Sequence, residues 1–195
     1  ASYDDDTIAW YENDGNEVFT QQVVTTDADG ARSVYAADID SDGDIDLMSA
    51  SYNDNTIAWY ENDGMQAFTK QVLTSKADGA TAVYAADMDD DGDLDMVSAS
   101  SGDSTIRWYD HRENGRFTEK VISTNTYFPD SIYATDMDGD GDIDLLSNNG
   151  YRAAYTYWYE NDGDDIFTPH TSDILSGTDV SSVYAADLNG DGYVD

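Results

Sequence analysis

The sequence predicts an all-β fold made of four copies of one unit. A tyrosine within VYAAD or IYATD recurs at Tyr35, Tyr84, Tyr133 and Tyr184, at separations of 49, 49 and 51 residues. A WY pair also occurs four times, and a phenylalanine follows nine residues after each tryptophan. Segments rich in β-branched and aromatic residues alternate with Asx-Gly turns, and no helical apolar period is present. Units of about 40 to 50 residues with four short strands are typical of β-propeller blades, whereas a β-solenoid, the weaker alternative, usually has shorter repeats.

Each unit is expected to contain four antiparallel strands, A to D. In the second copy, residues 81–87 (TAVYAAD) form strand A, and residues 93–100 (DLDMVSAS) carry strand B. One copy earlier, residues 56–62 (TIAWYEN) form strand C, and residues 67–75 (AFTKQVLTS) form strand D. Because adjacent tryptophan and tyrosine side chains of strand C point to opposite faces, we expect sheets that are covered on both sides.

One β-propeller domain is predicted over residues 1–195. Its repeat units are residues 33–81, 82–130, 131–180, and a composite unit of residues 181–195 plus 1–32. The opening ASYDDDTIAWYENDG matches residues 50–64, and Asp195 is the counterpart of Asp46. A composite blade closed by both ends would give a four-bladed ring, which is the first expectation. A head-to-tail dimer of eight blades and a piece of a longer array are the alternatives.

The composition restricts the partners. The formal charge is −34, so nucleic acid is excluded as a partner because phosphate contacts need basic surface. There is no cysteine, hence no disulfide or thiolate metal site. No apolar run approaches the roughly 20 residues of a membrane span, and no signal peptide is visible, although a leader could have been removed.

Four nine-residue loops hold 19 of the 42 acidic residues: DIDSDGDID, DMDDDGDLD, DMDGDGDID and DLNGDGYVD. Like charges repel by about 1 kcal/mol per pair at about 4 Å even in water, so a cation is expected. Positions 1, 3, 5 and 9 offer side-chain oxygens, position 6 is a turn glycine, and position 7 can ligate through its carbonyl. The predicted ligands are Asp38, Asp40, Asp42, Asp44, Asp46, Asp87, Asp89, Asp91, Asp93, Asp95, Asp136, Asp138, Asp140, Asp142, Asp144, Asp187, Asn189, Asp191, Tyr193 and Asp195.

Such an all-oxygen cage suits Ca²⁺ better than octahedral Mg²⁺, and up to four ions are expected, one per repeat. An EF-hand is excluded, because its position 12 needs a glutamate and here holds Ser49, Ser98 or Ser147. The metal would hold together the A–B hairpin of every blade, with the last site weakest because Asn189 replaces a carboxylate. Acidic, solvated turns without metal are the alternative.

The DxDxDGxxD spacing between two strands resembles the FG-GAP repeat of integrin α-subunit propellers. The WYENDG and F-T elements resemble its bacterial VCBS-type relatives. The resemblance covers the whole chain. It implies a secreted or cell-surface calcium-binding β-propeller, of the kind associated with adhesion, carbohydrate binding or accessory domains of larger secreted proteins.

A ligand face is expected opposite the calcium loops, because strand direction places the B–C and D–A connections together there. The repeats diverge on this face, where exposed aromatic residues could stack on sugars. The candidate residues are Tyr127, Phe128, Tyr151, Arg152 and Tyr155, with Tyr157 beside them. The alternative is repeat drift, with these aromatic residues packing between loops.

The sequence contains no motif for catalysis, and an enzyme is not expected. His111 and His170 are read as structural. Half of the basic residues lie in the third copy, and we expect them to contact a neighbouring acidic blade rather than an anionic ligand: Arg107, Arg112, Arg116 and Lys120. Two functions stay open, namely an extracellular binding module for a glycan or protein ligand, and a purely structural or oligomerising propeller.

Overall fold

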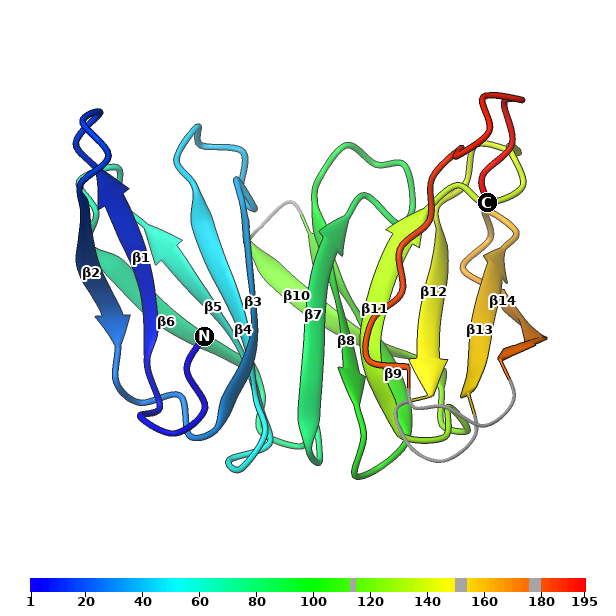
Figure 1. Ribbon diagram of the computed structural model, residues 1–195, viewed down its shortest axis with the longest axis horizontal. Helices are drawn as coiled ribbons and strands as arrows, with labels where there is room; N and C mark the ends of the chain where they lie inside the picture. Colours follow the sequence, from blue (N-terminus) through cyan, green and yellow to red (C-terminus); the bar gives the residue numbers. More distant parts are fainter. Residues whose placement is uncertain (113–114, 150–153, 176–179) are drawn as a thin grey trace.

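The computed structural model describes residues 1–112, 115–149, 154–175 and 180–195, and all of its regular structure is β-strand (Figure 1). No helix in these ranges is long and apolar enough to cross a membrane. The chain starts with a two-stranded sheet, the N-terminal hairpin, formed by β1 (Ile8–Asn13) and β2 (Phe19–Thr25). Three four-stranded antiparallel sheets follow it along one array.

Each four-stranded sheet is one blade, and its strands occur in sequence order as predicted. Blade 1 consists of β3 (Ala31–Ala37), β4 (Asp46–Ser51), β5 (Thr56–Asn62) and β6 (Phe68–Thr74). Blade 2 consists of β7 (Ala80–Ala86), β8 (Asp95–Ser100), β9 (Thr105–Arg112) and β10 (Arg116–Ser123). Blade 3 consists of β11 (Pro129–Thr135), β12 (Asp144–Asn149), β13 (Ala154–Asn161) and β14 (Phe167–Leu175). The predicted A, B, C and D strands are therefore confirmed for these three blades, to within two residues at each end, whereas residues 181–187 form no strand.

The hydrophobic core lies between neighbouring sheets rather than within one sheet. Strands β4 and β8 are buried along their whole length, which explains why their sequences are apolar or small on both faces. The recurrent tryptophan and phenylalanine meet across these junctions: Trp59 packs edge-on against Phe117 at 5.6 Å, and Trp108 against Phe167 at 6.1 Å between ring centroids. The recurrent tryptophan of one blade therefore contacts the recurrent phenylalanine of the next blade.

The A strands form the inner edge of the array. Their tyrosine rings make a continuous row, with centroid distances of 4.6 Å for Tyr35–Tyr84, 5.3 Å for Tyr84–Tyr133 and 4.7 Å for Tyr133–Tyr184. Burial raises the pKa of the Tyr84 phenol, and the neighbouring tyrosine hydroxyls raise it further. Small residues beside this row let the blades converge at the inner edge, while tryptophan and phenylalanine separate them farther out.

The loops divide between the two ends of the blades as expected. Among the described residues, the A–B loops lie at the top of Figure 1 together with the C–D turns of the N-terminal hairpin and of blades 1 and 3. The B–C connections of blades 1 and 2, and the D–A connections that lead into blades 1, 2 and 3, lie at the bottom. At the bottom, Arg32 lies over the ring of Tyr52 at 4.2 Å and pairs with Asp130 at 3.4 Å. This pair joins blade 1 to blade 3 across the inner edge, so the array is curved.

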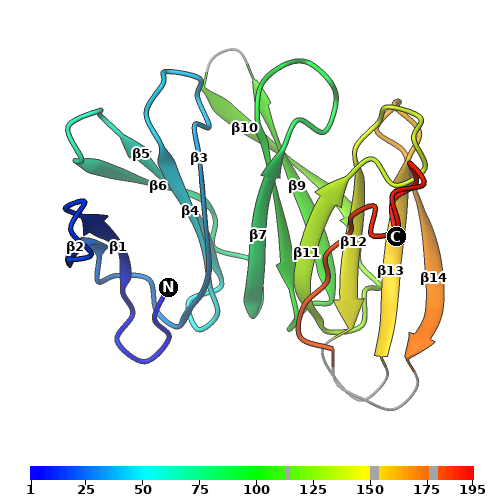
Figure 2. The same cartoon turned by 45° about the horizontal axis from the view of Figure 1, so that its top comes forward.

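The array is open in this structure, and closure into the expected four-bladed ring is not confirmed. The N-terminal hairpin and residues 180–195, here called the C-terminal segment, lie at opposite ends of the array in both ribbon views (Figures 1 and 2). The hairpin is a two-stranded sheet, and the backbone of Ala186 pairs locally with that of Asp195. The composite blade of residues 1–32 and 181–195 is thus not formed within this chain.

Candidate metal centre

Three A–B loops gather carboxylates at one end of the blades. In each loop three aspartates bring one oxygen each to within 4.8 Å of one another. The groups are Asp38, Asp40 and Asp42; Asp87, Asp89 and Asp91; and Asp136, Asp138 and Asp144. The first two groups are the predicted positions 1, 3 and 5, and the third combines positions 1, 3 and 9.

Local hydrogen bonds explain why this sequence pattern folds into a cage. In the first loop the N–H of Gly43 donates to Oδ2 of Asp38 at 3.1 Å, and the N–H of Asp44 donates to Oδ1 of Asp42 at 2.9 Å. Gly43 has a φ of +96°, a conformation that costs a residue with a Cβ free energy. The equivalent Gly92, Gly141 and Gly192 have φ values between +92° and +102°, so the predicted turn at position 6 is confirmed.

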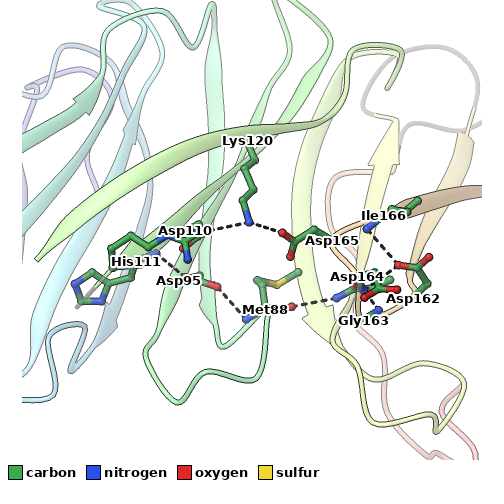
Figure 3. Close-up of polar contacts among 12 residues, drawn as sticks. Met88, Asp95, Asp110, His111, Lys120, Asp162, Gly163, Asp164, Asp165 and Ile166 are labelled. Carbon is green, nitrogen blue, oxygen red and sulfur yellow. Dashed lines mark hydrogen bonds and ion pairs between the residues drawn. The ribbon is translucent and has the colours of Figure 1, made fainter. Parts of the chain in front are cut away.

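The aspartate at position 9 has a second role that the sequence interpretation missed. Oδ1 of Asp95 accepts the N–H of His111 at 2.7 Å, and Oδ2 accepts the N–H of Met88 at 3.1 Å (Figure 3). Asp46 and Asp144 make the same two contacts in their own blades. This carboxylate therefore ties the A–B loop to the end of strand C. The signal available in the sequence was a carboxylate at the start of a strand that is apolar on both faces.

Burial of this carboxylate has an electrostatic cost. Desolvation raises the pKa of Asp95 to about 7, although its hydrogen bonds from the backbone of His111 and Met88 act in the opposite direction. Desolvation also raises the pKa values of Asp46 and Asp144. A nearby cation would stabilise the ionised form of all three.

The side chain at position 7 points away from the cage. A Cβ built on Gly163 of the C–D turn would lie 2.7 Å from Oδ2 of Asp142, and Gly64 is in the same close contact with Asp44. Carboxylates that lie over the C–D turn agree with the expectation that position 7 ligates through its backbone carbonyl. Tyr193, at position 7 of the last loop, has an exposed side chain that such a role would tolerate.

Two oxygen atoms in the cages test whether a cation fits. Oδ1 of Asp38 and Oδ1 of Asp89 are buried and have no hydrogen-bond donor. Desolvation raises the pKa of Asp89, and the negative charge of Asp91 raises it further. In the first loop, the pKa of Asp40 is raised by desolvation and by the charge of Asp42. Buried acceptors without donors are rare in folded proteins. A hard, oxygen-seeking divalent cation would satisfy both the unpaired oxygens and the excess negative charge.

The fourth loop has the same backbone but a poorer donor set. The N–H of Gly192 donates to Oδ2 of Asp187 at 2.9 Å, and the N–H of Asp191 donates to Oδ1 of Asn189 at 2.8 Å. Asp195 accepts the N–H of Leu188 at 3.0 Å. The backbone N–H groups of Gly192, Gly190 and Asp191 donate to the exposed Asp187 and lower its pKa. With an amide at position 3, this loop offers one carboxylate fewer than the others at positions 1, 3, 5 and 9, and Tyr193 replaces the aspartate of position 7.

The predicted ligand face is only partly described. Tyr127 and Phe128 are exposed and meet edge-to-face at 5.1 Å, and Tyr155 is also exposed. Tyr157 stacks on the buried Tyr159 at 6.2 Å. Tyr151 and Arg152 lie outside the described residues. Arg32 belongs to the same face, through its contacts with Tyr52 and Asp130. The sequence interpretation missed it, although this position differs in every copy, with Thr81, Asp130 and Ser181 in the other three.

Among the basic residues of blade 2, Lys120 contacts a neighbouring acidic blade, as expected. Lys120 pairs with Asp165 of blade 3 at 2.7 Å and with the buried Asp110 of its own blade at 2.7 Å (Figure 3). Arg107 pairs with Asp103 and Glu119, and Arg112 pairs with Asp110, all within blade 2.

The two histidines occupy aromatic surroundings. The buried His111 stacks on Phe117 at 4.6 Å. His170 stacks on Trp158 at 4.6 Å and contacts Glu160 at 2.6 Å.

Comparison with known families agrees with the repeat pattern. The FG-GAP-like repeat matches four times, over residues 1–49, 38–98, 87–147 and 136–195. A search of curated proteins found no match. The matched segments overlap at the acidic loops and together span the sequence from end to end. The chain therefore belongs to the FG-GAP-like repeat family.

Proposed function

We propose that this chain is an extracellular calcium-binding module in which each ion fastens the A–B loop of a blade. The observation that carries the proposal is the pair of buried carboxylate oxygens without donors, on Asp38 and Asp89. Each belongs to a group of three carboxylates whose mutual repulsion a Ca²⁺ ion would remove.

Calcium would act on the blade through the position-9 aspartate. Asp95 already links the loop to strands β8 and β9, because it accepts N–H groups from Met88 and His111. An ion held by Asp87, Asp89 and Asp91 would fix the loop on its other side. The position-5 ligands are exposed, so water retains access to the site. Sites of this open kind suit the millimolar calcium of extracellular fluids.

Ligand recognition is proposed for the end of the blades opposite the calcium loops. Tyr127, Phe128 and Tyr155 present exposed rings there, beside the polar side chain of Asp130. Flat aromatic faces next to hydrogen-bonding groups suit a glycan or a peptide loop. A glycan array, probed with and without calcium, separates this binding role from a purely structural one.

Calcium binding is tested by counting ions on the folded protein. Native mass spectrometry and calorimetry should detect calcium on the wild type, and Asp89→Asn should remove one ion. Asp164→Asn is the matched control, because it makes the same charge change at an exposed aspartate on the same end of the blades. If Asp89→Asn bound as many ions as the wild type with equal affinity, the proposed site would be wrong.

A further inference from the structure

The two ends of the array expose surfaces that are buried everywhere else. At each internal junction, the residue at loop position 2 inserts between two blades. Ile39 does this between blades 1 and 2, and Met88, which is 2% exposed, does it between blades 2 and 3 (Figure 3). Each residue packs near the tryptophan of its own blade and the phenylalanine of the next one.

The N-terminal end lacks such a residue and has a pocket in its place. The pocket has a volume of about 280 Å³ and is lined by Trp10, Ala36, Ile45 and Phe68, among others. These residues correspond to Trp59, Ala85, Leu94 and Phe117, which enclose the junction between blades 1 and 2. Beside the pocket, Val34 is 37% exposed, whereas its counterpart Val83 is 5% exposed. We call this surface, formed by Trp10, Val34, Ala36, Ile45 and Phe68, the N-terminal face.

The C-terminal segment carries the missing residue. Leu188 occupies loop position 2, as Ile39 and Met88 do, yet it is 82% exposed. Tyr184 extends the tyrosine row by packing at a tilt against Tyr133, and it is 74% exposed. Large apolar side chains with this exposure indicate an interaction surface.

A hydrogen bond across the junction of blades 2 and 3 also has a counterpart at the N-terminal face. In the junction between blades 2 and 3, Nδ2 of Asn161 donates to the carbonyl of Met88 at 3.1 Å and to that of Ile143 at 3.2 Å. At the N-terminal face, Nδ2 of Asn62 donates to the carbonyl of Ile45 at 3.0 Å. The carbonyl of Leu188 is the acceptor equivalent to that of Met88.

We propose that the C-terminal segment of one copy docks on the N-terminal face of a second copy, with Leu188 in the pocket. The contact repeats an interface that this chain already forms between its own blades, which is why a second copy is the occupant. A head-to-tail contact of this kind either closes into a ring or extends into a chain. The chain carries a formal charge of −34, so two copies repel each other and added salt should strengthen the contact.

Sedimentation velocity tests this proposal. The wild type should associate reversibly, with a dissociation constant between about 1 µM and about 1 mM, as expected for a contact of modest size. Leu188→Asp and Ala36→Glu should each be monomeric, because each places a carboxylate in the apolar contact from one side. Val121→Asp, an exposed position on the outer strand β10 of blade 2, should associate like the wild type. Circular dichroism checks that the variants fold.

A mixture of the two variants gives the sharper result. Leu188→Asp keeps an intact N-terminal face, and Ala36→Glu keeps an intact C-terminal segment. Together they should form one-to-one dimers and nothing larger. A wild type that is monomeric throughout, a Leu188→Asp variant that associates normally, or a mixture that stays monomeric would each overturn the proposal. Neither substituted residue is a predicted metal ligand, but Leu188 lies between the predicted ligands Asp187 and Asn189. Sedimentation is therefore measured both in calcium and in EDTA, and association that fails only in EDTA would separate a loss of calcium from a loss of the contact itself.

Discussion

The A–B loop of blade 2 (residues 87–95) and the loop of the C-terminal segment (residues 187–195) share one spacing but not one environment. In both, a glycine with a φ near +90° makes the turn, and position 9 accepts the N–H of position 2. In blade 2, Asp95 is fully buried and also holds the N–H of His111. In the C-terminal loop, Asp195 is exposed and Leu188 projects into solvent.

This difference separates what a loop encodes by itself from what its neighbours supply. The backbone conformation is local, since it recurs without a following blade. Burial, and the pKa changes that burial causes, come from strand C and from the next blade. The pKa of Asp95 is raised to about 7 by desolvation, while the pKa of the exposed Asp187 is lowered by the backbone N–H groups around it.

Removal of calcium should give the largest effect. Each saturated site stabilises the folded state by about 2.7 kcal/mol at a hundredfold excess over the dissociation constant. Loss of three such sites should lower Tm by on the order of 20 °C in a chain of this size. Differential scanning calorimetry in calcium and in EDTA measures it.

Hydrogen exchange, measured with calcium and in EDTA, compares the loop of blade 2 with the loop of the C-terminal segment. Amide protection should fall strongly around Gly92 and little around Gly192 when calcium is removed. An unchanged melting curve after confirmed metal removal would contradict the proposed role of calcium. An equal loss of protection in both loops would show that burial does not strengthen the site.

Truncation of the position-2 side chain should have the next largest effect. Met88→Ala removes a buried side chain from the junction of blades 2 and 3 and should lower the free energy of unfolding by about 3 kcal/mol. Leu188→Ala, at the equivalent position, should change it by less than about 0.5 kcal/mol at low protein concentration. Urea denaturation monitored by tryptophan fluorescence gives both values, and equal costs would mean that Leu188 is already buried in solution.

Most of the fold could be predicted from the sequence because the same pattern of strands and turns occurs four times. The period fixed the strand order, and the glycine at position 6 indicated the turn before its φ was known. The match between each tryptophan and a phenylalanine nine residues later gave no sign that Trp59 meets Phe117 of the next blade rather than Phe68 of its own. That contact depends on how blades stack, which no single repeat contains.

Closure could not be predicted for a related reason. The angle between blades results from side-chain volumes at several depths, from the tyrosine row at the inner edge to Trp108 and Phe167 farther out. Small errors in that angle accumulate over successive units. The double role of Asp95 was also hidden, because a carboxylate in an acidic loop looks like a ligand whether or not its oxygens already accept backbone N–H groups.

The smallest effect expected here concerns that double role. In calcium, Asp95→Asn should lower the free energy of unfolding by about 2 kcal/mol, because an amide has one acceptor oxygen for the two N–H groups that the carboxylate binds. Asp195→Asn keeps one oxygen for its one observed contact, with Leu188, and should cost less than about 0.5 kcal/mol. Chemical denaturation at fixed calcium measures both, and calorimetry shows whether either variant also loses an ion. If Asp95→Asn lost calcium without loss of stability in the metal-free protein, position 9 would act as a ligand alone, and its contacts with Met88 and His111 would contribute nothing to the blade.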